Sequence, residues 1–311
     1  MHSTDQMNIK HALNEKGGMQ VWWRLLRPHT LTASFVPVFV GTMLANIDGT
    51  INIPLFLAML IASMLIQAAT NMFNEYYDFV RGLDNEESVG IGGTIVRDGI
   101  AAKTVLRLAL SFFAVAMLLG VYICAVSSWW IAVIGLACML FGYLYTGGPL
   151  PIAYTPLGEL FSGFLMGTVI ICISYFIQTL TITASTILVS IPVAIFIGCI
   201  MMSNNIRDLD GDKENGRKTI AILLGRKNAI RFLGALFVIA FGLTAYYIID
   251  GLLPIWSLIV FLSGIKAVDV YRKFQGKTKP IEMLPAMVAT GKTNTIYGFL
   301  LGISLLLSEV F

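Results

Sequence analysis

Nine apolar segments, each long enough to cross about 30 Å of hydrocarbon, dominate this chain of 311 residues. Of its residues 57% are hydrophobic and only 13% are charged, which is about half the charged fraction of a typical soluble domain. The segments lie roughly at 30–46, 54–77, 103–122, 127–146, 156–176, 183–206, 228–249, 252–270 and 292–309. We therefore expect an all-α membrane protein with nine transmembrane helices.

The basic residues are unevenly distributed between the two ends of these segments. The connections after the first, third, fifth and seventh segments contain no Lys or Arg. All 21 Lys and Arg residues lie before the first segment, or in and beside the connections after the second, sixth and eighth segments. Because cytoplasmic connections are enriched in Lys and Arg, we expect a multi-pass protein of the cell (plasma) membrane with a cytoplasmic N-terminus and its C-terminus outside. Residues 1–22 are expected to form a polar cytoplasmic tail, and residues 23–311 one polytopic domain.

A first cluster of polar side chains closes the second apolar segment. If the helix of that segment continues, four oxygen-bearing side chains at i, i+3, i+4 and i+7 spacing share one face. These side chains are Asn71, Asn74, Glu75 and Asp78, and Asp84 follows them.

A second cluster closes the sixth segment. Asn204, Asp208 and Asp212 follow one another at intervals of four residues, and Asn205 lies beside the first of them. Basic residues surround this second acidic face, namely Arg207, Lys213, Arg217 and Lys218.

Both clusters lie on the side of the membrane that we expect to be cytoplasmic. Their carboxylate and amide oxygens suit Mg²⁺, which binds proteins through a few carboxylates and keeps phosphate oxygens and water in its shell. Either cluster alone is equally well explained as ordinary helix caps, but two matched clusters with basic neighbours favour a Mg²⁺-dependent site for a phosphorylated ligand. The glycine-rich stretch Gly90–Gly99 adds backbone N–H groups and Arg97 at the same end of the expected helices. Ionisation of a diphosphate ester needs such positive charge, together with a cavity that excludes water.

Several motifs in this chain resemble those of the UbiA-type membrane prenyltransferases, over nearly its whole length from Trp22. The motifs are Arg27-Pro-His-Thr-Leu31, Asn71-x-x-Asn-Glu-Tyr-Tyr-Asp78 with Gly82-Leu-Asp84, Tyr145-Thr-Gly-Gly-Pro149, Gly158-Glu159, and Asn204-Asn-Ile-Arg-Asp-Leu-Asp-Gly-Asp212 continuing to Gly216-Arg-Lys-Thr219. Within the family the chain looks like the branch that prenylates 1,4-dihydroxy-2-naphthoate. The loop 149–154 lacks the lysine found in several ubiquinone-type relatives, which also favours the naphthoate branch.

This resemblance implies helices around a central cavity, with Mg²⁺ bridging a polyprenyl diphosphate to both acidic motifs. It assigns Asn74 and Asp78 to the first metal site and Asp208 and Asp212 to the second, as the catalytic residues. Glu75 is a further candidate metal ligand, at a position where many relatives have Asp. The residues Asn71, Asp84 and Asn205 would support these ligands.

The resemblance also suggests residues that contact the two substrates. The candidates for the diphosphate oxygens are Arg97, Arg207 and Lys213. Tyr145, like Tyr143 and Tyr154, is either an ordinary interface residue or a group that stabilises the allylic cation and orients the acceptor ring. Glu159 is either a buried structural residue or a group that orients or deprotonates the acceptor, and His29 is expected to be an interface residue.

The implied reaction is an electrophilic aromatic substitution. Diphosphate leaves, the electron-rich ring attacks the allylic cation, and the ring carboxyl is lost as CO₂, giving demethylmenaquinone. Another aromatic acceptor, such as 4-hydroxybenzoate, homogentisate or haem, remains an alternative. A secondary transporter is less consistent with the sequence, because transporters place polar groups near the midplane whereas these acids gather at one end. Nothing in the sequence indicates a nucleic-acid ligand or an obligate protein partner.

Overall fold

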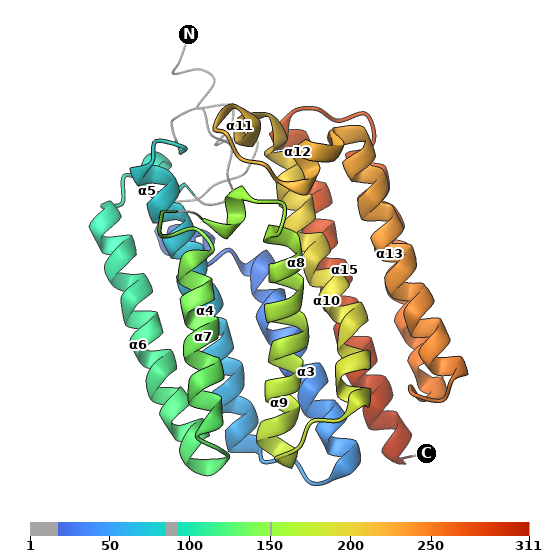
Figure 1. Ribbon diagram of the computed structural model, residues 1–311. Helices are drawn as coiled ribbons and strands as arrows, with labels where there is room; N and C mark the ends of the chain where they lie inside the picture. Colours follow the sequence, from blue (N-terminus) through green and yellow to red (C-terminus); the bar gives the residue numbers. More distant parts are fainter. Residues whose placement is uncertain (1–17, 85–92, 150, 311) are drawn as a thin grey trace.

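Long helices lie side by side along one common direction, and short helices and loops cover one end of the bundle (Figure 1). The computed structural model describes residues 18–84, 93–149 and 151–310. Within these ranges the chain forms helices and connections but no strand. The expected all-α architecture is therefore confirmed for the described part of the chain.

Six helical stretches among the described residues are long and apolar enough to cross a membrane. They are α3 (Pro28–Asp48), α4 (Ile53–Val80), α6 (Ala102–Val126), the continuous stretch Gly158–Thr179, α10 (Ala184–Arg207) and α13 (Arg226–Ile249). The stretch Gly158–Thr179 consists of α8 (Gly158–Ser162), the π-helix η2 (Gly163–Val169) and α9 (Ile170–Thr179). The chain is thus a multi-pass membrane protein.

The other three expected segments are helical as well. α7 (Trp130–Leu144) is a shorter apolar helix, the 3₁₀ helix η3 (Ile255–Ser263) continues as α14 (Gly264–Phe274), and α15 (Pro280–Val310) is the last helix. Each expected segment overlaps one helical stretch of the described chain. That all nine cross the membrane stays a prediction.

Two boundaries differ from the expected ones. α15 begins at Pro280 and not near residue 292, because Glu282 and Pro285 interrupt the apolar pattern of its first turns, in which Met283 and Met287 are buried. Pro is well tolerated at the start of a helix, where its missing N–H has no intrahelical partner. Helix α2 (Met19–Leu26) lies partly within the expected polar tail and buries Val21 and Leu25.

Short elements complete the covered end of the bundle. They are α5 (Thr94–Arg97), η1 (Ile152–Tyr154), α11 (Leu209–Glu214) and α12 (Ile220–Leu224). Figure 1 shows α5, α11 and α12 at the end of the bundle where α4 and α10 finish, opposite the end at which α15 finishes. The two polar clusters of the sequence therefore lie at the same end.

The local sequence explains where α4 and α10 begin. The side chain of Asn52 caps α4 by accepting a hydrogen bond from the Leu55 N–H at 3.1 Å. Thr183 caps α10 in the same way, with its hydroxyl accepting from the Thr186 N–H at 3.1 Å. Both helices then continue for more than twenty residues to the covered end.

The packing divides the bundle into a filled part and a hollow part. Where α3, α10, α13 and α15 meet, Phe196, Phe237 and Tyr297 are buried, and the rings of Phe196 and Tyr297 lie 4.4 Å apart. Between α4, α6, α7, α9 and α10 the helices instead line a cavity. This cavity opens towards the residues that end α4 and begin α11.

Two glycines let the π-helical stretch η2 approach α10 closely. A Cβ atom added to Gly163 would lie 2.6 Å from the Ala194 carbonyl oxygen, and one added to Gly167 would lie 2.4 Å from the Ala194 Cα. Small residues at this spacing allow helix backbones to meet in membranes. The contact fixes the wall of the cavity that η2 and α10 share.

We predict that Gly167→Ala destabilises the protein, because the added methyl group collides with the α10 backbone and not with a flexible side chain. Overpacking of this kind costs about 1–3 kcal/mol. The matched control is Gly242→Ala in α13, where no atom lies within 4 Å of the added Cβ. Thermal unfolding in detergent should show a lower Tm for Gly167→Ala and an unchanged or higher Tm for Gly242→Ala. Equal Tm values for the two variants would contradict the close packing.

Candidate active site

A cavity of about 680 Å³ connects the covered end of the bundle with its interior. Its inner walls are mainly apolar, with Met59, Ile66, Ile131, Leu165 and Ile173 among the lining residues. Polar and charged side chains gather where α4 ends and α11 begins. The cavity therefore combines a charged mouth with an interior suited to a hydrocarbon chain.

The first acidic motif lies on the last turns of α4. The Asn74 amide donates to Asp78 Oδ2 at 2.9 Å, one helical turn away. Arg27 Nη1 donates to Asn74 Oδ1 at 2.8 Å from the break between α2 and α3, where Arg27 has a left-handed backbone (φ 51°). Asn71, Asn74 and Asp78 all line the cavity, as their helical spacing predicts.

Glu75 does not lie among the cavity-lining residues, although its spacing placed it on the same face. Its side chain is fully buried and accepts hydrogen bonds from the Thr94 hydroxyl and from the Ile95 N–H at 3.1 Å. It thereby fastens α5 to α4. The arrangement argues against Glu75 as a metal ligand, because its carboxylate accepts hydrogen bonds from α5 and it does not line the cavity.

The second acidic motif is divided between two helices. α10 ends at Arg207 and α11 begins at Leu209, so that Asp208 stands between them. The Asp212 N–H donates a hydrogen bond to the Asp208 carbonyl at 2.8 Å, so the helical pattern of hydrogen bonds four residues apart resumes directly after the break. Arg207 holds the Asp208 carboxylate with its guanidinium, with Nε 2.6 Å from Oδ1. Both aspartates line the cavity mouth.

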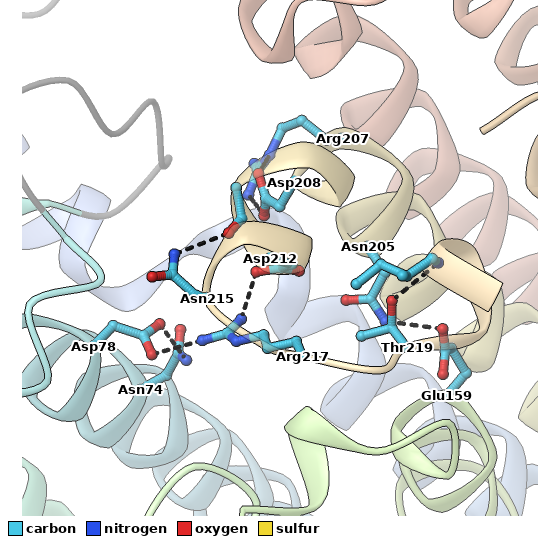
Figure 2. A network of polar contacts seen from close by, with 12 residues as sticks. Asn74, Asp78, Glu159, Asn205, Arg207, Asp208, Asp212, Asn215, Arg217 and Thr219 are labelled. Carbon is cyan, nitrogen blue, oxygen red and sulfur yellow. Dashed lines mark hydrogen bonds and ion pairs between the residues drawn. The ribbon is translucent and has the colours of Figure 1, made fainter. Parts of the chain in front are cut away.

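Arg217 links the two motifs across this mouth, as Figure 2 shows. Its Nη2 lies 2.9 Å from Asp78 Oδ1, and its Nη1 lies 2.9 Å from Asp212 Oδ1. The guanidinium also packs over the ring of Tyr154, 4.8 Å from the ring centre. The three charged side chains are only 11–13% exposed, so the ion pairs are largely shielded from solvent.

Burial raises the pKa of Asp212 to about 7. The nearby Arg217 guanidinium opposes this rise, whereas the negative charges of Asp208 and Asp78 add to it. Two carboxylates that face each other in a poorly solvated site disfavour each other's ionised form. Additional positive charge at this mouth would therefore hold Asp212 in its ionised form at neutral pH.

The donor set of the mouth fits a Mg²⁺ ion. Asn74, Asp78, Asp208 and Asp212 offer amide and carboxylate oxygens, which are hard ligands of the kind that Mg²⁺ takes. Among the described residues no three His, Cys, Asp or Glu side chains form a ready metal cluster, and Arg217 lies between Asp78 and Asp212. The residues thus suit an ion that takes only a few protein ligands and fills its shell with oxygens of a ligand or water.

The structure brings most of the expected substrate-contacting residues to the cavity. The expected residues that line it are Asn71, Asn74, Asp78, Asp84, Tyr145, Asn205, Arg207, Asp208 and Asp212. Those that do not line it are Glu75, Arg97, Glu159 and Lys213.

The residues outside the cavity have other surroundings. Lys213 is exposed on α11, and Arg97 ends α5. Glu159 is buried behind the cavity wall, where its Oε1 accepts a hydrogen bond from the Asn205 amide at 2.8 Å. The expected glycine-rich phosphate loop lies partly in residues 85–92, which are outside the described part of the chain.

Three basic residues line the cavity although the sequence did not mark them as site residues. They are Arg27, His29 and Arg217. The motifs containing Arg27 and Arg217 were visible in the sequence, but spacing along the chain does not reveal contacts between residues as far apart as Asp78 and Arg217. His29 was expected at the membrane interface, yet it begins α3 beside the break at Arg27 and faces the cavity.

The fold and the site together define a multi-pass membrane protein with an apolar cavity and an acidic, arginine-braced mouth. The profile of the UbiA prenyltransferase family matches residues 34–284, and the chain belongs to that family.

Two bacterial relatives are similar over nearly the whole chain. The 1,4-dihydroxy-2-naphthoate octaprenyltransferase of Bacillus subtilis is 54% identical over 308 residues, covering 99% of both chains. The protein of the same name from Escherichia coli is 27% identical over 298 residues, covering 93% of this chain and 96% of its own.

Solved structures share the fold at low sequence identity. A UbiA homolog from Archaeoglobus fulgidus bound to GPP and Mg²⁺ has a TM-score of 0.64 at 18% identity, covering 90% of this chain and 98% of its own. The apo structure of a UbiA homolog from Aeropyrum pernix K1 has a TM-score of 0.67 at 14% identity, covering 91% and 98%. The helical bundle is therefore the UbiA fold.

We predict that Glu75→Asp destabilises the protein more than Glu75→Gln does. Glutamine keeps the length needed to accept from Thr94 and Ile95, whereas aspartate is one methylene too short to reach both donors. Leaving buried donors unsatisfied costs about 1–3 kcal/mol. Thermal unfolding in detergent measures the difference, and Glu214→Asp at an exposed position of α11 is the control.

If Glu75 were a metal ligand, Glu75→Asp would be tolerated better than Glu75→Gln. Aspartate would then preserve Mg²⁺ dependence, and glutamine would abolish it. If Glu75→Asp is as stable as the unaltered protein while Glu75→Gln loses Mg²⁺-dependent activity, the fastening role is wrong.

Proposed function

We propose that this protein transfers a polyprenyl group from a polyprenyl diphosphate to 1,4-dihydroxy-2-naphthoate, with release of diphosphate and CO₂. The product is demethylmenaquinol, which oxidises to demethylmenaquinone, in menaquinone (vitamin K2) biosynthesis. One observation supports this type of reaction most strongly: two acidic motifs, paired with arginines, meet at the mouth of an apolar cavity. The acceptor is supported by the 54% identity to the B. subtilis enzyme over 99% of both chains.

The charged mouth is where the diphosphate binds. Asn74, Asp78, Asp208 and Asp212 would hold Mg²⁺, which when bound would supply positive charge to neutralise the charge that develops on the departing diphosphate. The Arg207 and Arg217 guanidiniums lie at the same mouth and donate hydrogen bonds to the diphosphate oxygens. A Mg²⁺ role is supported by the donor chemistry of the mouth and by the A. fulgidus homolog, whose structure contains GPP and Mg²⁺.

The apolar interior receives the prenyl chain and excludes water from the reacting carbon. When the bond between that carbon and the diphosphate oxygen breaks, the bonding electrons leave with the diphosphate. An electron-rich ring carbon of the acceptor then forms the new carbon–carbon bond, and the carboxylate leaves as CO₂, returning its bonding electrons to the ring. Dry walls prevent water from capturing the cation in place of the ring.

Residues at the cavity wall orient the acceptor. The Asn205 amide is held by Glu159 at 2.8 Å, which fixes the direction of the side chain that faces the cavity. Tyr145 also lines the cavity. We assign Asn205 and Tyr145 to acceptor binding, and Glu159 to the positioning of Asn205.

We also propose that nine segments cross the plasma membrane, with the charged mouth and the N-terminus in the cytoplasm and the C-terminus outside. The Lys and Arg residues gather in the connections at the covered end, which supports a cytoplasmic position for that end. α15 finishes at the opposite end of the bundle (Figure 1). The segment from α2 onwards forms one domain around the cavity.

The first experiment measures prenyl transfer by the purified protein from a long polyprenyl diphosphate. We expect a prenylated naphthoquinol and CO₂ with 1,4-dihydroxy-2-naphthoate and Mg²⁺, and no product with EDTA. Asp78→Asn should lower the rate by at least about 100-fold, the scale seen when one preorganised charge-stabilising group is lost. Asp250→Asn, at an exposed carboxylate where α13 ends, is the control and should keep the rate. If the protein transferred the prenyl group only to 4-hydroxybenzoate, the proposed acceptor would be wrong. If EDTA left the transfer unaffected, the proposed metal site would be wrong.

The second experiment tests the orientation with alkaline phosphatase, which is active only outside the cytoplasm. A fusion after residue 311 should be active, and a fusion within the connection 215–219 should be inactive. The reverse pattern, or activity of both fusions, would contradict the proposed topology.

A further inference from the structure

Arg217 joins two acidic groups that come from distant parts of the chain. It follows the turn at Gly216, where φ is 76°, and its N–H donates to the Asp212 carbonyl at 2.9 Å. Its guanidinium reaches Asp212 on one side and Asp78 on the other, both at 2.9 Å. The Lys218 N–H donates to the Tyr154 carbonyl at 2.9 Å, which holds the backbone beside Arg217 against η1. The backbone that carries the Arg217 side chain is therefore held in place on both sides.

Three of the four carboxylate oxygens of Asp78 and Asp212 accept hydrogen bonds in this arrangement. Asp78 Oδ1 accepts from Arg217, and Asp78 Oδ2 accepts from the Asn74 amide at 2.9 Å. Asp212 Oδ1 accepts from the other arm of the Arg217 fork. A metal ion that binds these aspartates must therefore compete with a positive charge that already bridges them.

A metal ion that arrives alone gains little from this competition. It would leave the Arg217 guanidinium, which is only 13% exposed, beside a divalent cation and without its two carboxylate partners. A buried charge that loses its partners is strongly unfavourable. The ring of Tyr154 would still contact the guanidinium at 4.8 Å, but an aromatic face does not replace two charged hydrogen-bond acceptors.

A metal ion that arrives with a diphosphate restores those partners. The planar guanidinium fork matches phosphate oxygens, to which it donates two parallel hydrogen bonds. A diphosphate at the mouth would replace the two carboxylates as the acceptors of the Arg217 guanidinium. Metal and diphosphate then bind more tightly together than either binds alone.

We propose that Arg217 is an internal counter-ion that closes the two acidic motifs against free metal ions and yields only to a metal bound together with a diphosphate. The inference rests on the proposed function, since it assumes that the mouth binds a metal and a diphosphate. Beyond that function, the metal ion binds tightly only together with the diphosphate, and Arg217 is the residue that makes the binding of one depend on the other. Because coupling between two ligands is reciprocal, Arg217 raises the affinity for each ligand in the presence of the other.

The test measures Mn²⁺ binding to the full chain in detergent by electron paramagnetic resonance. Mn²⁺ is the probe for the divalent ion, and geranyl S-thiolodiphosphate is the unreactive diphosphate probe. Three proteins are compared, namely the unaltered chain, Arg217→Gln and Arg226→Gln. Arg226 is the matched control. It pairs at 3.0 Å with Asp210, which lies on α11 like Asp212, but the Asp210 side chain is 66% exposed.

We expect the unaltered chain and Arg226→Gln to bind Mn²⁺ weakly alone and at least about tenfold more tightly with the thiolodiphosphate, within the range of typical coupling between linked sites. Arg217→Gln should bind Mn²⁺ alone about tenfold more tightly than the unaltered chain, and the thiolodiphosphate should strengthen Mn²⁺ binding by a clearly smaller factor than in the unaltered chain. A role that is merely structural would lower the Tm without tightening Mn²⁺ binding. Arg217→Lys keeps the charge but loses the fork, and it should change Mn²⁺ binding in the same direction if Arg217→Gln does not fold.

Two results would overturn the inference in different ways. If the thiolodiphosphate strengthens Mn²⁺ binding equally in the unaltered chain, Arg217→Gln and Arg217→Lys, the metal–diphosphate site stands and the role of Arg217 is wrong. If the unaltered chain binds no Mn²⁺ even with the thiolodiphosphate, the proposed metal site fails as well, and the inference fails with it.

Discussion

The ion pairs of Arg217 with Asp78 and Asp212 are the contact on which the arrangement of the charged mouth depends. Acidic side chains at the end of an apolar bundle are poorly solvated, so two of them facing each other are stable only with a positive charge between them. Arg217 supplies this charge from a turn that follows α11, and Tyr154 supports it from η1. Three separate parts of the chain, namely α4, η1 and α11 with the turn that follows it, thus meet at one guanidinium at the covered end of the bundle.

The cavity below this mouth is a consequence of uneven packing. Aromatic and aliphatic side chains fill the space between α3, α10, α13 and α15, whereas glycines bring η2 against α10 and leave room between α4, α6, α7 and α9. A hydrocarbon chain and a diphosphate need opposite surroundings, and the structure provides both within one space of about 680 Å³. In the proposed reaction, the phosphorylated end of the substrate would meet charge, and its reactive carbon would lie among apolar side chains.

The sequence predicted the parts of this structure that local patterns control. Apolar length located the helices, and the four-residue spacing placed Asn74 and Asp78 together on α4. It misplaced Glu75, because spacing gives the side of a helix but not the reach of a side chain towards Thr94 of another element. It placed Arg217 beside the second acidic face but did not predict its contact with Asp78, because that contact joins residues far apart in the chain and depends on the turn at Gly216. Hydropathy also set the start of the last helix too late, since Glu282 and Pro285 interrupt the apolar pattern in the first turns of α15.

A crystal structure of the protein with Mn²⁺ and geranyl S-thiolodiphosphate would show directly whether the two acidic motifs share one metal, because the anomalous signal locates the Mn²⁺ ion. We expect an anomalous peak at the cavity mouth within coordination distance of oxygens from both acidic motifs. We also expect the Arg217 guanidinium to contact the diphosphate and the prenyl chain to enter the apolar interior. A metal bound elsewhere, or a diphosphate bound away from Asp78 and Asp212, would contradict the central claim that the two motifs form one site.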